Sequence, residues 1–129
     1  MILSNEEVKT CLLWVLQSYL DKYDMHIDTL SISLNHQMMI KANIEYGSNM
    51  LAIQGKCDVI YQDYDLILKN IEGQVNYSFI SMNLIQLLQQ YMHHEYIAII
   101  NNAIYCHIPL PIKELILEDE HLHLKLIEM

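Results

Sequence analysis

Apolar side chains recur at helical spacing over the first part of the chain. Ser4 and Glu7 have the spacing of a capping box, which favours a helix that begins there. The apolar positions that follow are Val8, Cys11, Leu12, Leu13, Trp14, Val15, Leu16, Tyr19, Leu20 and Tyr23. They leave only a narrow polar strip, whereas an ordinary surface helix buries a stripe roughly 100° wide. We therefore expect a helix from Ser4 to about Lys22 with a curved sheet wrapped around it.

From about Ile27 the spacing changes to the alternation typical of β-strands. Gly47 and Ser48 interrupt this alternation and predict a two-residue turn. The turn pairs Tyr46 with Asn49, Ile44 with Leu51, Ala42 with Ile53 and Ile40 with Gly55. These pairs put the apolar side chains of both strands on one face, as a hairpin requires.

A second turn near Gln62 and Asp63 extends the sheet. It pairs Tyr61 with Tyr64, Val59 with Leu66 and Cys57 with Leu68. The inward-facing residues are even-numbered at Leu66 and Leu68 and odd-numbered from Ile71 onward. One extra residue near Lys69-Asn70, a β-bulge, accounts for this change. Gly55 and Gly73 lie within strands, and bulges and in-strand glycines both bend sheets. The sequence therefore predicts a strongly curved antiparallel sheet of about four to six strands.

The rest of the chain predicts a short helix followed by strands. Ser81 is the expected cap of an amphipathic helix with the stripe Leu84, Leu87, Leu88 and Tyr91. Residues 96–108 return to strand composition, and Asn101-Asn102 fits either a turn or polar positions in one long strand. Pro109 and Pro111 end that ladder, and a closing strand carries Leu122, Leu124 and Leu126. This order of elements predicts an α+β fold.

Composition and charge exclude several classes of function. Of the 129 residues, 53% are hydrophobic and three are glycine, so we expect one folded domain over residues 1–129 without a glycine-rich phosphate loop. Sixteen acidic residues face seven lysines, and arginine is absent. The net charge of −9 repels nucleic acids and anionic lipid surfaces, so we expect no nucleic-acid partner.

Several features indicate a cytoplasmic protein. The N-terminus lacks the basic segment of a signal peptide. The longest stretch without charged residues, 73–94, is rich in Gln and Asn, so no transmembrane segment is expected. Cys11, Cys57 and Cys106 are odd in number and widely spaced, which does not fit a disulfide framework. We expect three reduced thiols.

Residue patterns for catalysis or cofactor binding are missing from the sequence, which has no P-loop, GxGxxG, GxSxG or HExxH motif. His121 and His123 share a strand face at a spacing that a metal ion can use, but beside Lys125 they fit a solvated face better. The residues His93-His94-Glu95 cannot share one helical face. The acidic run from Glu114 to Glu120 lacks calcium-loop spacing and fits a solvated turn. We therefore expect no enzyme, no cofactor and no metal site.

The apolar excess is the informative feature. Eight methionines and a helix that is apolar on most sides indicate a large, deformable interior, which suits a non-enzymatic module that binds a fatty acid or another lipid-like molecule. From strand and helix parity, the expected ligand contacts are Leu13, Trp14, Met38, Tyr61, Tyr77 and Phe79. A filled core without a ligand is the simpler alternative. In that case the chain would be a structural interaction domain that acts as a homodimer or docks on a protein partner, and Met39, Met50, Ile60 and Ile67 would cover a subunit interface.

The layout resembles the tubular lipid-binding (TULIP-like) bacterial domains. The segment 71–88, IEGQVNYSFISMNLIQLL, is similar to their step from strand to helix. The segment 104–126, with Pro109-Leu110-Pro111 before a closing strand, is similar to their end. The resemblance covers most of the chain as a layout and implies a curved sheet around a long helix and an apolar ligand. It transfers no functional residue.

Overall fold

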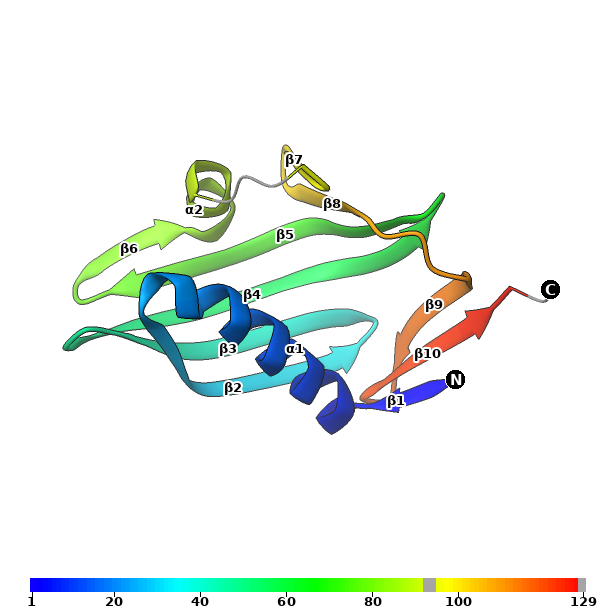
Figure 1. Ribbon diagram of the computed structural model, residues 1–129, viewed down its shortest axis with the longest axis horizontal. Coiled ribbons are helices and arrows are strands. Elements are labelled where there is room, and N and C mark those ends of the chain that lie inside the picture. Colours follow the sequence, from blue (N-terminus) through cyan, green and yellow to red (C-terminus); the bar gives the residue numbers. More distant parts are fainter. Residues whose placement is uncertain (92–94, 128–129) are drawn as a thin grey trace.

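The computed structural model describes residues 1–91 and 95–127 (Figure 1). It confirms the α+β class and the antiparallel pairing. In chain order, the elements are β1 (Ile2–Ser4), α1 (Asn5–Leu20), a 3-10 turn (Asp21–Tyr23), β2 (Met25–Asn35), β3 (Gln37–Tyr46), β4 (Asn49–Gln62), β5 (Asp65–Tyr77), β6 (Ile80–Asn83), α2 (Leu84–Tyr91), β7 (Ile97–Ile100), β8 (Ala103–His107), β9 (Ile112–Glu118) and β10 (His121–Leu126).

Two antiparallel sheets make up the strand content. The larger has seven strands in the order β2-β3-β4-β5-β8-β7, with β6 also paired to β5. The smaller has the order β1-β10-β9, so strands from the two ends of the chain lie side by side (Figure 1). The larger sheet exceeds the expected four to six strands because the short strands β6 and β7 add to the predicted meander.

Both helices lie on one side of the larger sheet. Leu12 and Leu13 of α1 pack against the core formed with β2 and β3. Leu84 of α2 lies over the paired glycines Gly55 and Gly73 of β4 and β5. This side is called the helix face, and the opposite side, which neither α1 nor α2 covers, is called the open face. One covered and one solvated face are typical of antiparallel sheets.

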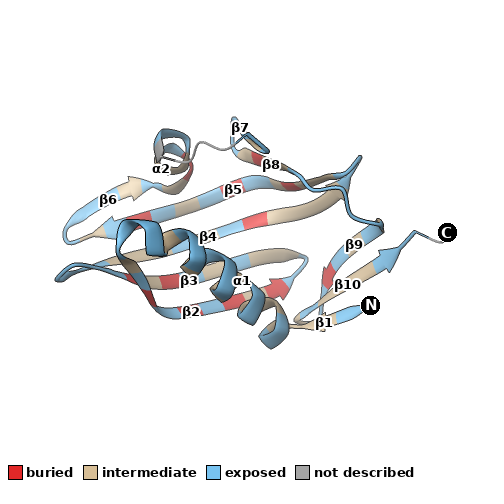
Figure 2. Ribbon diagram, in the orientation of Figure 1, coloured by how far each residue is buried: buried red, intermediate tan, exposed pale blue. Residues whose placement is uncertain are grey.

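Most of the buried apolar residues in the described chain fall into two clusters (Figure 2), and buried Ile67 and Val75 belong to neither. The first lies under α1 and comprises Ile27, Leu30, Ile32, Leu34, Ala42, Ile44 and Leu117. The second lies under α2 and comprises Cys57, Ile71, Ile85 and Ile104. Half-buried Met38 and Val59 pack against both clusters and so join them.

The wrapping of the sheet around α1 is not confirmed. None of the sixteen residues of α1, all of them described, is buried, and Trp14 is 76% exposed. In Figure 1 the helix crosses one face of a sheet that does not close around it. The capping box at its start is present, because the Ser4 hydroxyl accepts from the Glu7 N–H and the Glu7 carboxylate accepts from the Ser4 N–H. Because α1 is apolar on most of its circumference and the sheet covers only one side, part of its apolar surface is exposed to solvent.

The first hairpin has the predicted register. Tyr46 pairs with Asn49 and Ile40 with Gly55. The bulge near Lys69-Asn70 is also confirmed, because the pairing of β4 with β5 shifts by one residue there and Asn70 takes a left-handed φ of 52°.

The second hairpin differs from the predicted register by two residues. Tyr61 pairs with Leu66 rather than with Tyr64. The turn residues are Asp63 and Tyr64, with φ values of 52° and 66°, so both adopt the left-handed conformation of a type I′ turn. Such a turn usually carries Asn or Gly, whereas this sequence has Asp63 and Tyr64 at the two turn positions.

Of three smaller predictions, the cap of α2 is wrong, the alternative at Asn101-Asn102 is resolved as a turn, and the end of the strand before Pro109 is confirmed. The cap of α2 is Asn83, whose side-chain oxygen accepts from the Gln86 N–H at 3.1 Å, and not Ser81, which lies in β6. Asn101-Asn102 forms the turn between β7 and β8. The ladder of β8 ends before Pro109, as expected.

A side chain of α1 covers part of the free edge of β2. The Gln17 side-chain amide donates to the Met25 carbonyl oxygen at 3.0 Å, and its oxygen accepts from the Ile27 N–H at 2.9 Å. One Gln side chain therefore makes the two bonds that a neighbouring strand would make. Next to it, Asp28 is the extra residue of a bulge, and charges and bulges both protect edge strands from pairing with other chains.

Candidate functional site

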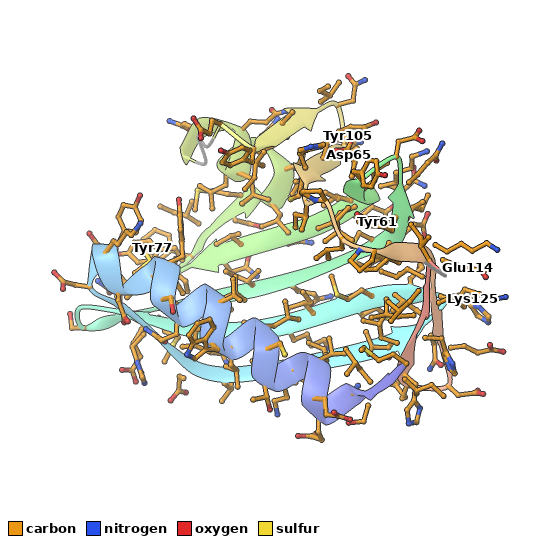
Figure 3. The ribbon with its side chains drawn as sticks, turned by 45° about the vertical axis from the view of Figure 1, so that its right-hand side comes forward. Tyr61, Asp65, Tyr77, Tyr105, Glu114 and Lys125 are labelled. Atoms are coloured by element: carbon orange, nitrogen blue, oxygen red, sulfur yellow. The ribbon has the colours of Figure 1, made fainter. Side chains whose placement is uncertain are left out.

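The six expected ligand contacts do not meet in one cavity. Leu13 and Met38 pack against the first core cluster. Tyr77 is half-buried near the end of β5 (Figure 3). Trp14 and Phe79 lie on the surface rather than in the interior, since Trp14 occupies the outer side of α1 and Phe79, 95% exposed, lies in the turn between β5 and β6.

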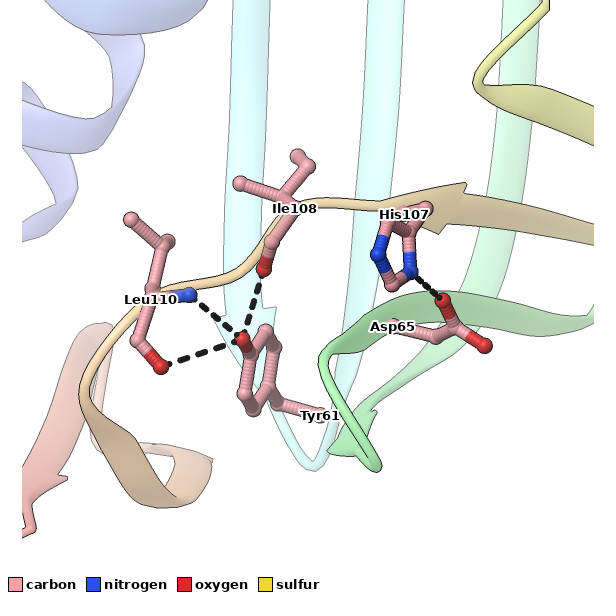
Figure 4. Close-up of polar contacts among 5 residues, drawn as sticks. All are labelled: Tyr61, Asp65, His107, Ile108 and Leu110. Atoms are coloured by element: carbon pink, nitrogen blue, oxygen red, sulfur yellow. Dashed lines mark hydrogen bonds and ion pairs between the residues drawn. The ribbon is translucent and has the colours of Figure 1, made fainter.

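Tyr61 has a structural role in the described chain (Figure 4). Its hydroxyl lies 2.6 Å from the Ile108 carbonyl oxygen, to which it donates, and accepts from the Leu110 N–H at 2.9 Å. The Leu110 carbonyl oxygen is 3.2 Å away. These bonds hold the segment around Pro109 against β4, so the half-buried ring is committed to the crossing between β8 and β9.

The outer side of α1 presents several exposed apolar side chains. We call Cys11, Trp14, Val15, Ser18 and Tyr19 the α1 outer face; all five are exposed. They carry no charge, although the chain has a net charge of −9. Tyr19 lies 5.6 Å from the Tyr23 ring, and Lys22 Nζ lies 6.0 Å from the centre of the Tyr19 ring. Contiguous exposed apolar side chains mark interaction sites more often than isolated ones do.

The predicted subunit interface on the other side of the sheet is only partly exposed. Met39 and Met50 are exposed, and Ile60 is half-buried. Ile67, which was expected in the same interface, is 7% exposed, because Ile60 and Tyr105 flank it on the neighbouring strands. These four residues therefore do not form one apolar surface.

Two shallow hollows of about 220 Å³ each lie on the open face. They share Lys41 and Gln54 and are lined by the polar side chains of β2 to β5. Lys56 and Glu72 form an ion pair at 3.3 Å in one of them. Polar side chains in alternation are what a solvated sheet face requires, so these hollows indicate no ligand.

A third hollow, of about 330 Å³, lies where β5, β8 and β7 meet. We call it the β7–β8 hollow; its lining residues are Asp65, Glu95, Tyr96, Ile97, Ala98, Tyr105 and His107. His107 Nδ1 is 2.9 Å from Asp65 Oδ1 (Figure 4), and the two residues are opposite each other in the β5–β8 ladder. The sequence alone indicates no partner for His107, because this contact depends on the pairing of two residues that lie 42 positions apart.

Glu120 was predicted to lie in a solvated turn, but its carboxylate accepts four hydrogen bonds. The donors are Asn5 Nδ2 at 2.6 Å, Ser33 Oγ at 2.8 Å, Asn35 Nδ2 at 2.9 Å and the Leu34 N–H at 3.0 Å. These bonds hold the pKa of Glu120 below its usual value, with the Leu34 N–H as the largest cause. Glu120 therefore ties the start of α1 to β2 and to the turn between β9 and β10.

The cysteines and histidines give no indication of catalysis. Cys57 is buried, and burial raises the pKa of its thiol to about 11, which suppresses the reactive thiolate. The rings of His121 and His123 lie 6.3 Å apart. Among residues 1–91 and 95–127, no three His, Cys, Asp or Glu side chains are grouped to hold a metal ion. His93 and His94 lie outside the described residues.

Comparisons with known proteins give no relative, since no protein-family model, no curated protein and no solved structure matches the chain. Within the described part of the chain, the helices are too short or too polar to cross a membrane.

Proposed function

We propose that this chain is a non-enzymatic module that binds an apolar ligand, such as a fatty acid or another lipid-like molecule, along α1. The observation that carries the proposal is the α1 outer face, which is apolar, uncharged and exposed. In the bound state, the ligand covers the part of the helix circumference that the sheet leaves open. Sheet and ligand together then enclose α1. The three unpaired cysteines suit a reducing compartment and so support a cytoplasmic location.

The energy available from this surface is sufficient for a small ligand. Burial of a large apolar side chain contributes about 1.5–3 kcal/mol. Trp14 is 76% and Val15 56% exposed, so covering these two with Tyr19 offers several kcal/mol before the cost of association. The absence of charge on the α1 outer face disfavours a charged partner there, but Lys22 at its end offers an ammonium group to a carboxylate.

Trp14 is the only tryptophan, so its fluorescence reports on this surface directly. We expect a saturable blue shift when a long-chain fatty acid is added below its micellar concentration. Val15→Asp should weaken binding at least tenfold, whereas Met39→Asp, on the open face, should not. Lys22→Glu should weaken binding of the fatty acid but not of the matching fatty alcohol. Absence of a shift, or unchanged binding by Val15→Asp, would overturn the proposal.

A second candidate function is homodimerisation through the same surface. The specific observation is again the uncharged α1 outer face, because two copies with a charge of −9 each can approach most closely where neither presents charge. Sedimentation equilibrium distinguishes the two functions. A dimer that forms without ligand and is lost in Val15→Asp supports self-association. A monomer at high concentration that still binds fatty acid supports the ligand.

A further inference from the structure

We propose that the β7–β8 hollow binds a small organic cation, namely an alkylammonium group. This site is separate from the α1 outer face and does not depend on the function proposed for α1. Its volume of about 330 Å³ falls within the range of small-molecule sites, about 300–1,000 Å³.

The charge of the hollow favours a cation. Asp65 and Glu95 bring two carboxylates to its wall, and none of the lining residues is a lysine. His107 is the one lining residue that can carry positive charge, and it stands against two carboxylates. The net charge of −9 adds a long-range attraction for cations.

The aromatic lining narrows the kind of cation. Tyr96 and Tyr105 line the hollow together with Ile97 and Ala98. A ring face attracts an organic ammonium group through its quadrupole, while the methyl groups of the ligand fit the apolar wall. A bare metal ion would need its donors grouped around one point, and no three His, Cys, Asp or Glu side chains of the described residues are grouped in that way. Carboxylates beside tyrosine rings are therefore better suited to an alkylammonium ion.

Strand pairing positions Asp65, Ala98 and Tyr105 before a ligand arrives. The Asp65 carboxylate lies 2.9 Å from the His107 ring Nδ1. The His107 backbone N–H donates to the Tyr96 carbonyl oxygen at 3.0 Å. Ala98 pairs with Tyr105 across the β7–β8 ladder, and Asp65 and Tyr105 lie at the same end of the sheet (Figure 3). Because Ala98 is the small member of its pair, it leaves room beside the Tyr105 ring.

The test uses the full chain and tetramethylammonium chloride as the probe. At pH 8 and constant ionic strength, we expect saturable amide chemical-shift changes at Ala98, Tyr105 and His107 with a millimolar Kd. The uncharged molecule of the same shape, tert-butanol, should bind at least tenfold more weakly. No saturable change up to 100 mM, or equal binding of tert-butanol, would overturn the proposal.

Variants test whether the two carboxylates of the hollow, rather than the fold as a whole, are responsible for binding. Asp65→Asn with Glu95→Gln should weaken binding at least tenfold. Glu114→Gln with Glu118→Gln removes the same charge from β9 and should leave binding unchanged. If the first pair disturbs the spectrum of the whole chain, Ala98→Leu keeps the carboxylates, fills the hollow and should weaken binding to the same extent. Retained affinity in both Asp65→Asn/Glu95→Gln and Ala98→Leu would contradict the site.

A second arm identifies the source of the ammonium group. Vesicles of phosphatidylcholine that broaden the same amides, and compete with tetramethylammonium, would assign the site to a lipid headgroup. Vesicles without effect, with tetramethylammonium binding retained, would assign it to a soluble cation.

Discussion

Single carboxylates do more for this fold than its salt bridges do. Glu120 accepts hydrogen bonds from side chains and from the backbone of β2, and Asp58 accepts from Asn70 Nδ2 at 2.8 Å and from Gln37 Nε2 at 3.0 Å. The pKa of Asp58 is lowered chiefly by Asn70, next to the bulge of β5. In both cases folding favours the charged carboxylate. The surface ion pair Lys56–Glu72 joins neighbouring strands that the sheet already holds together, so it adds little.

Glu120→Gln should destabilise the protein at neutral pH, because the amide cannot accept all the hydrogen bonds of the carboxylate. The stabilisation by Glu120 is present above the ordinary glutamate value of 4.5 and is lost as the pH falls through the lowered pKa of the folded state. Urea unfolding of wild type and variant should therefore converge below about pH 4.5.

Glu118→Gln is the matched control, since Glu118 is exposed two residues away. It should change neither the stability nor its pH dependence noticeably. An unfolding midpoint for Glu120→Gln that equals that of Glu118→Gln at pH 7 would show that the four bonds contribute nothing. Asp58 keeps its own pH dependence in both variants.

At the scale of elements, α1 owes its position to polar side chains as much as to packing. None of its residues, each of which the structure describes, is buried. Gln17 binds the edge of β2 near one end of the helix, and Asn5 donates to the Ile32 carbonyl oxygen at 2.9 Å near the other. The helix is therefore attached at two points to the strand that it crosses.

Gln17→Ala should lower the free energy of unfolding by about 1–2 kcal/mol, because the Met25 carbonyl and the Ile27 N–H both lose a partner. It should also promote association at high concentration, since it uncovers part of the β2 edge. Thr10→Ala on the same helix, whose hydroxyl bonds only the Glu6 carbonyl, should have a smaller effect on both. Equal unfolding free energies for the two variants would contradict this role of Gln17.

The glycine pair under α2 gives a sharper test of close packing. A methyl group on Gly73 would lie 2.5 Å from the Gln54 carbonyl oxygen, whereas one on Gly55 would lie 3.0 Å from a Leu84 methyl group and 3.4 Å from the Glu72 carbonyl oxygen. Backbone atoms cannot move aside as a side chain can. Gly73→Ala should therefore lower the free energy of unfolding by more than about 2 kcal/mol, and Gly55→Ala by less.

Leu84→Ala distinguishes the two glycines. It should offset a large part of the effect of Gly55→Ala, where Leu84 is the nearest neighbour, and little of the effect of Gly73→Ala, where backbone remains in the way. A double-mutant cycle for each pair measures this coupling. The same coupling energy in both cycles would be inconsistent with the geometry.

The elements differ in how far the sequence determines them. Gly47 marked the first hairpin, and the change of parity after Leu68 marked the bulge at Asn70, so both were predictable. The Asp63-Tyr64 turn carries no glycine or asparagine, and its register was therefore wrong by two residues. The apolar circumference of α1 predicts burial on most sides, although a helix can equally present apolar side chains to solvent.

Contacts between distant segments explain what was missed in the candidate site. Asp65 meets His107, and Glu120 meets Asn5, only after strands far apart in the sequence have paired. Local periodicity carries no information on such pairs, whereas it does predict which side of a strand faces inward.

At the scale of the whole molecule, charge opposes association. Sixteen acidic residues against seven lysines give a net charge of −9 at pH 7 and an isoelectric point near 5.0. Copies of the chain therefore repel one another at neutral pH, and salt screens that repulsion. The apolar surface of α1 works against this repulsion.

Self-association should therefore strengthen between pH 7 and pH 5, because the net charge approaches zero near the isoelectric point of about 5.0. At pH 7 it should strengthen with added salt. Sedimentation at two pH values and two salt concentrations tests both trends. Association that weakens with salt at pH 7 would instead indicate an attractive, charged interface.

The pairing of β1 with β10 has a consequence for how the chain acquires its fold. Ile2 pairs with His123, and the N-terminal ammonium group donates to the Leu124 carbonyl oxygen at 3.0 Å. These contacts join residues that are far apart in the sequence, so they raise the contact order. Closing the long loop between β1 and β10 is slow. During synthesis, residues 2–4 emerge well before residues 121–123 and cannot pair until those have been made. Until then the start of α1 lacks its anchor at Glu120.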